Sequence, residues 1–165
     1  MSNFNVSHIM EIVESGLPLP AVNQCPLNPH LAQPQGELIA LCRKHNILFN
    51  AYSPLGAPDY HSYPGAIGTA SLLNDSVVLA IAKAHNRTPA QVLINYLWSH
   101  GIVTNPRTMN PAHMRENLAS YEFALSQGEV HQLDQFKADA CTDDSWYECC
   151  GSQTVQPSIP ACGPN

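Results

Sequence analysis

The sequence predicts an α/β fold in which parallel strands are joined by crossover helices, with an irregular tail after them. Two observations of the sequence and one rule of chain topology predict this fold. Short apolar runs typical of buried strands alternate with stretches whose apolar residues recur at helical spacing. Helix start and stop signals separate the two kinds of stretch. Strand–helix alternation of this kind is the pattern that crossover connections between parallel strands produce.

The first third of the chain supplies two helices and two strands. Asn5 is a candidate N-cap for a first helix, and Gly16 is its stop signal. Residues 20–24 are a short strand candidate, and residues 35–46 carry apolar positions at helical spacing. Residues 47–52 form a buried-looking strand, which a Ser-Pro-Leu-Gly turn ends.

Helices dominate the middle of the chain. Residues 56–70 form a long loop rich in Gly, Pro, Tyr and His, and loops of that length are often functional. A helix is predicted over residues 76–86. A second helix begins at Thr88-Pro89-Ala90-Gln91, which combines an N-cap, a proline at the first helical position and a capping glutamine, and it runs to about His100.

The last predicted elements are one strand and two helices. The strand closes at Val103, and Asn110-Pro111 starts a helix with an apolar stripe of Met114, Leu118 and Tyr121. Ser126-Gln127-Gly128-Glu129 is a capping box for a final helix. We expect residues 137–165, which are rich in Cys, Pro and Gly, to be an irregular tail.

Composition narrows the class of protein. The chain has 165 residues, of which 44% are hydrophobic, so it can bury one core. Its formal net charge of −6 would repel a polyanion, so we expect no nucleic-acid partner. It contains no apolar run of membrane-spanning length and no signal-peptide pattern at Met1, so we expect a cytoplasmic protein without a membrane partner.

The six cysteines give no metal-binding pattern. Four of them fall in the last 25 residues, and the adjacent Cys149-Cys150 pair has no C-x-x-C spacing. We expect thiols rather than disulfides and predict no metal site. A thiol or metal function of the tail is the third and weakest functional hypothesis.

Polar side chains collect where the predicted parallel strands end. In chain order these positions are Ser2-Asn3, Asn23-Gln24, Tyr52-Ser53 and Arg107-Thr108. In parallel α/β folds, chemistry gathers at the carboxyl ends of strands. The set holds amides, hydroxyls, a phenol and a cation, but no acidic pair and no nucleophile–base pair. It suits holding a planar polar ring and an anion, especially because a helix start follows Arg107-Thr108.

Five short motifs together carry a family resemblance. In chain order they are SNF, AVNQ, AYSPLG, TPAQVLI and the PRT…REN segment. At these spacings, residues 2 to 136 resemble the C-terminal half of an aldo-keto reductase. The resemblance implies half of a (β/α)8 TIM barrel over residues 1–136, followed by the tail of residues 137–165. It also implies reduction of aldehydes or ketones to alcohols with NADP(H).

The resemblance implies a set of cofactor-binding residues. Ser2, Asn3 and Gln24 would hold the nicotinamide carboxamide, and Tyr52 would stack on the nicotinamide ring. The remaining positions would line the pyrophosphate (Ser53, Leu55), the adenosine 2′-phosphate (Arg107, Thr108, His113) and the adenine (Glu116, Asn117).

Four positions depart from the family pattern. Arg107 stands where the family usually has lysine, which alters the geometry of a phosphate contact. His113 stands where arginine is usual, so a permanent positive charge is absent. Pro26 replaces an acid, and Ala57 stands where a small hydroxyl residue often lies. We therefore expect weaker cofactor binding than in a typical member.

Residue types alone also allow simpler roles for these positions. Tyr52 fits a rim aromatic, Arg107 a solvated charge, and Gln24 an amide that satisfies backbone groups. Capping or helix-surface roles fit the other polar positions: Ser2, Asn3, His113 and Glu116.

The resemblance places the catalytic Asp, Tyr, Lys and His in the other half of the barrel, so no catalytic residue is assigned here. We expect the chain to be a fragment or a truncated member that is inactive alone. Two functions stay open. One is an oxidoreductase that acts on a small carbonyl substrate once the missing half is supplied. The other is a non-catalytic remnant that binds NADP(H) or a partner. The exposed strand edges of a half barrel favour self-association or pairing with an N-terminal half.

Overall fold

The computed structural model describes residues 1–33, 35–56 and 72–136. The predicted tail at residues 137–165 and nearly all of the predicted loop at residues 56–70 lie outside the described residues, as does Ala57.

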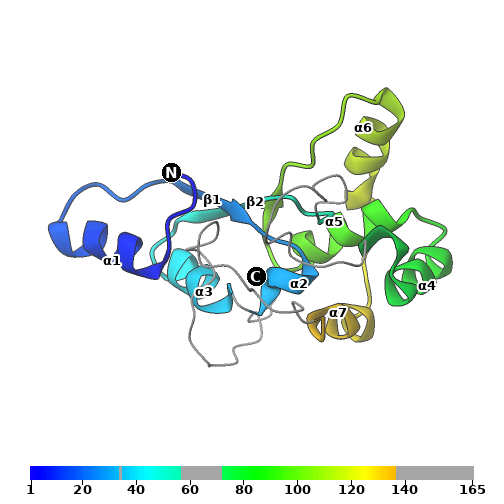
Figure 1. Ribbon diagram of the computed structural model, residues 1–165, viewed down its shortest axis with the longest axis horizontal. Coiled ribbons are helices and arrows are strands. Elements are labelled where there is room, and N and C mark those ends of the chain that lie inside the picture. The colour runs from blue at the N-terminus through cyan, green and yellow to red at the C-terminus, as the bar shows by residue number, and fades with distance from the viewer. Residues whose placement is uncertain (34, 57–71, 137–165) are drawn as a thin grey trace, which may run out of the picture.

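Three parallel strands form the centre of the fold (Figure 1). They are β1 (Val22–Pro26), β2 (Leu48–Tyr52) and β3 (Val103–Thr104), in the order β1-β2-β3. Ser2 forms an isolated parallel bridge to Gln24, so it lies on the side of β1 away from β2. The predicted fold class is therefore confirmed: parallel strands are connected by helices.

Seven helices and two 3-10 turns surround these strands in the described residues. Their bounds are α1 (Val6–Ser15), α2 (Pro29–Ala32), α3 (Gly36–Lys44), α4 (Ser76–Ala84), α5 (Pro89–Ser99), α6 (Pro111–Leu118), α7 (Gln127–Asp134), η1 (Leu72–Asn74) and η2 (Ala119–Tyr121). The sequence pattern did not reveal the four-residue α2, because so short a helix has no apolar periodicity.

The predicted caps begin these helices. The Asn5 side chain accepts a hydrogen bond from the N–H of His8 at 2.9 Å, and Gly16 ends α1 in the left-handed region at φ 69°. Thr88 and Ser126 form the expected capping boxes at α5 and α7. The Asn110 side chain accepts from the N–H of Ala112 at the start of α6. Local cap chemistry therefore sets where these elements start.

The sheet buries one face against helices and leaves the other less covered. Side chains alternate between the two faces of a strand. Asn23 and Cys25 of β1 and Ala51 of β2 are fully buried, and Phe49 is 5% exposed. The positions between them, such as Gln24, Asn50 and Tyr52, are half-buried, and Leu48 is 43% exposed. Helices α3 and α5 contact β2 and β3 respectively.

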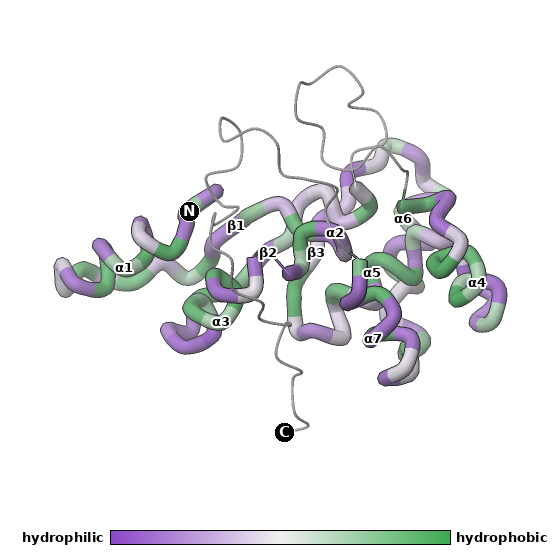
Figure 2. Tube along the Cα trace, turned by 60° about the horizontal axis from the view of Figure 1, so that its bottom comes forward, coloured by the Kyte–Doolittle hydropathy of each residue, from purple (hydrophilic) through white to green (hydrophobic). Residues whose placement is uncertain are grey.

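Helix α5 is central to the core, since every residue from Gln91 to Leu97 is buried. Helices α1 and α4 lie toward opposite ends of the molecule (Figure 2). Helix α6 stands away from the sheet and buries none of its residues. The predicted stripe on α6 is therefore not buried by the described residues: Met114 is 50% exposed and Leu118 is 73% exposed.

Two general expectations can be set against the described part of the chain. None of its helices is both long and apolar enough to cross a membrane. The cytoplasmic localisation stays a prediction. No cluster of three or more metal-ligating side chains occurs among the same residues.

Burial raises the pKa of the Cys42 thiol to about 11, despite an opposing hydrogen bond with Asn23, so this cysteine is a poor nucleophile near neutral pH.

Candidate functional site

The carboxyl ends of β1 and β2 bring Gln24 and Tyr52 to one face of the sheet. Gln24 lies beside Asn50, and Pro26 lies beside Tyr52, in the parallel register. Gln24, Asn50 and Tyr52 are half-buried and alternate with buried positions, so their side chains share the less covered face, whereas Pro26 is itself buried. The N–H of Leu27 donates to the carbonyl of Tyr52 at 3.0 Å, which extends the pairing to the strand ends.

Hydrogen bonds tie the Ser2-Asn3 segment to this face. The N–H of Asn3 donates to the Gln24 carbonyl at 2.8 Å, and the Ser2 hydroxyl donates to the same oxygen at 3.2 Å. The Tyr52 hydroxyl donates to the side-chain oxygen of Asn3 at 3.1 Å. The Tyr52 side chain therefore reaches across the end of β1. Asn3 has φ 59°, a left-handed conformation that asparagine adopts more readily than most residues.

The side-chain amide of Gln24 stays available. It has no hydrogen-bond partner among the described residues, although the N–H and the carbonyl of Gln24 are both bonded to the Met1–Asn3 segment. The alternative in which this amide satisfies buried backbone groups is not seen in this part of the chain. A ligand could meet both its donor and its acceptor.

Ser53 and Leu55 follow Tyr52 in a tight turn. Ser53 has φ 52°, an uncommon value for a residue other than glycine. Its carbonyl accepts from the N–H of Gly56 at 3.1 Å and from the Asn28 side chain at 3.3 Å. Leu55 is partly buried and packs against the core. Sequence reasoning missed Asn28, whose signal is its place as an N-cap directly before Pro29.

Arg107 and Thr108 lie just beyond β3. The N–H of Asn105 donates to the Ala51 carbonyl at 3.1 Å, so the chain stays paired with β2 until two residues before Arg107. Arg107 is exposed and has no ion-pair partner in the described part of the molecule. The Thr108 hydroxyl oxygen accepts from the N–H of Asn110 at 3.1 Å, which leaves its proton free to donate.

The start of α6 offers fewer donors than the sequence suggests. Pro111 has no N–H, the Asn110 side chain takes the N–H of Ala112, and the N–H of Met114 bonds to the Asn110 carbonyl. Only the N–H of His113 is without an acceptor among the described residues of this turn. An anion here would depend more on Arg107 and Thr108 than on the helix start.

Glu116 and Asn117 lie further along α6, where Glu116 also has a structural role. Its carbonyl accepts from the Gln91 side chain at 3.0 Å and from the Ser120 hydroxyl at 3.3 Å, which fastens α6 to α5. Both side chains are half-buried. Hydrogen bonds thus unite Ser2, Asn3, Gln24 and Tyr52, whereas no hydrogen bond between described residues joins that group to the residues from Arg107 to Asn117.

Sequence reasoning overlooked one further polar residue on this face. The Oδ1 atom of Asn50 is buried and has no partner among the described residues. Its signal was the single amide in the apolar run of β2. A buried acceptor without a donor is unfavourable, so this position would favour a ligand or a partner that donates a hydrogen bond.

Comparisons with known proteins agree with the resemblance. The model of the aldo/keto reductase family matches residues 1–138. Aldo-keto reductase family 1 member A1-A of Danio rerio is 37% identical over 136 residues, which are 82% of this chain and 41% of that protein. The crystal structure of a Bombyx mori aldo-keto reductase superposes with a TM-score of 0.72 at 31% identity, covering 82% of this chain and 40% of the other.

A neighbour with bound cofactor bears on the site. A Gox0644 variant solved in complex with NADPH superposes with a TM-score of 0.70 at 31% identity, over 82% of this chain and 45% of that one. In each of these comparisons the chain spans less than half of the relative's length. The described parallel strands and helices therefore match part of the fold of these aldo-keto reductases. The family match and the folds of these relatives agree, and the chain belongs to the aldo/keto reductase family.

Proposed function

We propose that this chain binds NADP(H) along the carboxyl edge of its sheet and serves an oxidoreductase that reduces small aldehydes or ketones. One observation carries the proposal. The half-exposed Tyr52 ring lies on the less covered face and is tied to Asn3, whose N–H donates to the carbonyl of Gln24. The family match and the NADPH complex of a structural neighbour support the same cofactor.

These residues fit a nicotinamide. A planar aromatic ring can stack on another, with a gain of roughly 0.5–1.5 kcal/mol beyond the burial of area. A carboxamide has one acceptor and two donors, which the amides of Gln24 and Asn3 and the Ser2 hydroxyl can satisfy. Because Asn3 is held by β1 and by Tyr52, these partners are positioned before a ligand arrives.

The segment after β3 fits the 2′-phosphate. Arg107 brings a guanidinium that is not neutralised by a described carboxylate, and guanidinium groups bind phosphate through two parallel hydrogen bonds. Thr108 adds a hydroxyl donor and His113 a main-chain N–H. A phosphate-free dinucleotide would gain nothing from these groups, so they would determine the preference for NADP(H) over NAD(H).

The bound cofactor would supply the hydride that reduces the carbonyl carbon. The chain's own residues would bind and orient the nicotinamide, since the candidate site contains no paired acid and base for the proton. The sequence resemblance assigns that proton transfer to residues of the other half of the barrel. A carbonyl substrate would then be handled by the completed barrel.

A non-catalytic role is the second candidate. The chain covers only 41% of its Danio rerio relative. A protein that matches this part alone, and that binds the cofactor without catalysing its oxidation, is consistent with that coverage. Mixing the purified chain with NADPH and a panel of aldehydes and ketones separates the two candidates. Oxidation of NADPH above the enzyme-free rate supports the reductase, whereas binding without oxidation supports the non-catalytic role for this chain.

Titration with NADPH, followed by nicotinamide fluorescence, tests the proposal itself. We expect Arg107→Ala to weaken NADPH binding about 10- to 100-fold, because a hydrogen bond to a charged group contributes roughly 1.5–3 kcal/mol. NADH binding should change less than about twofold, since NADH lacks the phosphate.

Arg115→Ala is the matched control, because it removes the same charge from an exposed position on α6. It should leave NADPH affinity nearly unchanged. Absence of NADPH binding to the parent chain would refute the proposal. Equal losses for NADPH and NADH in Arg107→Ala would place the phosphate elsewhere.

A further inference from the structure

The turn after β2 begins with a residue in an uncommon backbone conformation. Ser53 has φ 52°, in the left-handed region that residues other than glycine seldom adopt. Its carbonyl accepts a hydrogen bond from the N–H of Gly56 at 3.1 Å, which closes the turn. A conformation of this kind persists where neighbouring contacts hold it. The contacts around Ser53 therefore decide whether the turn keeps its shape.

Asn28 supplies a second contact to the same carbonyl. Its side-chain Nδ2 donates to the Ser53 oxygen at 3.3 Å, although the two residues are 25 positions apart. Its Oδ1 accepts from the N–H of His30 at 3.1 Å, so both ends of the amide are bonded. Beside it, the N–H of Leu27 donates to the carbonyl of Tyr52 at 3.0 Å. Two successive bonds thus attach the segment before α2 to the start of the turn.

Asn28 is 6% exposed, so its effect on a ligand would pass through Ser53. Ser53 is half-buried, and neither its N–H nor its hydroxyl is bonded to another described residue. Both groups can donate, whereas a pyrophosphate offers acceptor oxygens and negative charge. In the proposed site Tyr52 binds the nicotinamide and Arg107 the 2′-phosphate, and the pyrophosphate joins the two halves of the dinucleotide. Ser53, which follows Tyr52 directly, is suited to bind it.

We propose that Asn28 is a positioning residue for the pyrophosphate of the cofactor. Its side chain holds Ser53 in the left-handed conformation, in which the Ser53 N–H and hydroxyl donate to the pyrophosphate oxygens. This role rests on the proposed binding of NADP(H) and adds to it a residue that does not touch the ligand. Because NADPH and NADH share the pyrophosphate, Asn28 should affect the binding of both equally, unlike Arg107.

Asn28→Ser separates this role from helix capping. A serine oxygen still caps α2, because serine is about as good an N-cap as asparagine, but the shorter side chain no longer reaches the Ser53 carbonyl. We expect the affinities for NADPH and NADH, measured by fluorescence titration, to fall equally, by about three- to tenfold. The affinity for adenosine 2′-monophosphate, which has no pyrophosphate, should change less than about twofold.

Gln33→Ser is the matched control at the other end of α2. The Gln33 side-chain amide donates to the Asp134 carbonyl at 3.0 Å, so the substitution removes an amide contact of the same short helix without touching the turn. All three affinities should stay within about twofold of the parent. Unchanged affinity for both dinucleotides in Asn28→Ser overturns the proposal. An equal loss for adenosine 2′-monophosphate, or the same losses in Gln33→Ser, also overturns it, because either result shows a general structural role.

Hydrogen exchange tests the hold on the turn without any cofactor. The Gly56 amide bonds to the Ser53 carbonyl, so its exchange should be at least about threefold faster in Asn28→Ser than in the parent. Exchange at the parent rate overturns the inference even where no dinucleotide binds. Faster exchange, together with no NADPH binding to the parent, refutes the proposed function and the pyrophosphate role of Asn28, while its hold on the turn is confirmed.

Exchange of the Asn28 side-chain amide covers the case in which Asn28→Ser fails to fold. In the parent chain this amide is bonded to the turn, so saturation with NADPH should slow its exchange by keeping the turn closed. Adenosine 2′-monophosphate should leave the exchange rate unchanged. Equal rates with and without NADPH overturn the proposal.

Discussion

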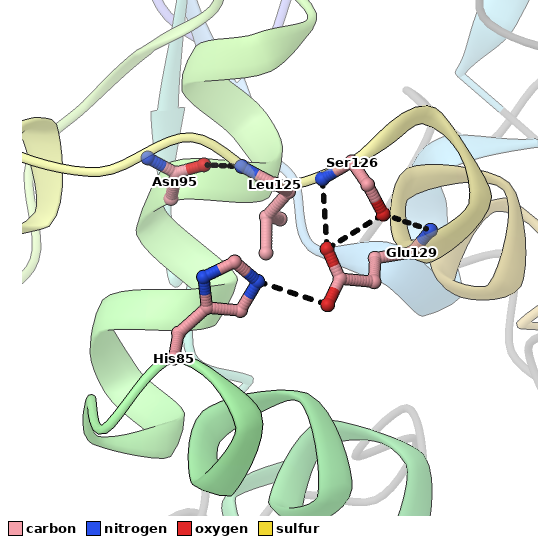
Figure 3. A network of polar contacts seen from close by, with 5 residues as sticks. All are labelled: His85, Asn95, Leu125, Ser126 and Glu129. Carbon is pink, nitrogen blue, oxygen red and sulfur yellow. Dashed lines mark hydrogen bonds and ion pairs between the residues drawn. The ribbon is translucent and has the colours of Figure 1, made fainter.

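The helical corner, formed by α5, α7 and the segment between η2 and α7, differs from the carboxyl edge of the sheet in how it treats polar groups. In the corner, the buried Asn95 side chain donates to the carbonyls of Ser120 and Phe123 at 2.8 and 2.7 Å. It also accepts from the N–H of Leu125 at 3.3 Å, as Figure 3 shows. At the edge, the Gln24 amide and the Arg107 guanidinium have no described partners.

At the start of α7 the polar groups are likewise hydrogen-bonded within the chain. Ser126 and Glu129 satisfy each other's donors in a capping box, and a Glu129 oxygen lies 2.9 Å from Nε2 of His85 (Figure 3). Burial raises the pKa of Glu129, but hydrogen bonds from Ser126 and His85 outweigh it, so the pKa lies below its usual value. The carboxylate is therefore committed to holding α7 against α4.

A trio of two buried rings and one partly exposed carboxylate completes the corner. The Tyr96 hydroxyl donates to an Asp134 oxygen at 2.9 Å, and Nε2 of His100 lies 3.1 Å from the same oxygen. Tyr96 is fully buried and His100 is 3% exposed. Burial, followed by the Asp134 charge, raises the pKa of Tyr96, so its hydroxyl stays protonated as a donor.

This difference indicates which residues affect folding stability and which affect cofactor binding. In the helical corner the polar groups bond to other parts of the chain, so substitutions there should alter stability and leave cofactor affinity unchanged. The edge keeps donors and acceptors available, so changes there should alter affinity with little effect on stability.

Loss of the Asp134 carboxylate should have the largest effect. Asp134→Ala leaves the buried Tyr96 hydroxyl and the buried His100 ring without their shared acceptor. We expect the free energy of unfolding to fall by about 3 kcal/mol, measured by urea denaturation. NADPH affinity, measured where the variant is folded, should change less than about twofold.

Gln135→Ala, at the exposed neighbouring position, is the control and should change stability by less than about 0.5 kcal/mol. A similar loss in both variants would mean that the end of α7, rather than the trio, is what matters. A large loss of NADPH affinity in folded Asp134→Ala would break the division between corner and edge.

Titration of the same carboxylate should give a smaller, graded effect. Burial alone would raise the pKa of Asp134. Hydrogen bonds from His100 and Tyr96 and nearby histidine charges lower the pKa by more than burial raises it, so the net pKa is depressed. A depressed carboxyl pKa contributes stability that is fully present above the unfolded value of about 3.9 and is lost as pH falls through the folded value. Unfolding followed from about pH 5 to about pH 3 should be less pH-dependent in Asp134→Asn than in the parent. Identical slopes would show that other carboxylates account for the acid sensitivity.

The contrast also explains what the sequence could predict. The caps at Asn5, Thr88 and Ser126 were predictable because each bond spans three residues. The strand-end positions were predictable because parallel strands bring their carboxyl ends to one edge. The trio was not, because His100 and Asp134 are 34 residues apart and nothing local marks them as partners.

Within the candidate site, the sequence could predict where residues lie but not which of their polar groups are already hydrogen-bonded. Sequence reasoning could place Gln24, Tyr52 and Arg107 at strand ends. It could not show that the Asn110 side chain takes the N–H of Ala112, since that depends on one side-chain rotamer. Nor could it connect Asn28 to the Ser53 carbonyl across 25 residues.

Tyr52→Ala should have the smallest effect of the series, and it tests the edge directly. Loss of the ring removes the stacking surface that NADPH and NADH would share, so both affinities should fall about tenfold, the equivalent of roughly 1.4 kcal/mol. Tyr52→Phe keeps the ring and removes the hydroxyl that bonds to Asn3, so it should stay within about twofold of the parent. Fluorescence titration with both dinucleotides measures each value. Unlike Arg107→Ala, neither variant should discriminate between the cofactors. A selective loss of NADPH in Tyr52→Ala would place this ring near the phosphate instead, and the nicotinamide assignment of Ser2, Asn3 and Gln24 would then fail with it.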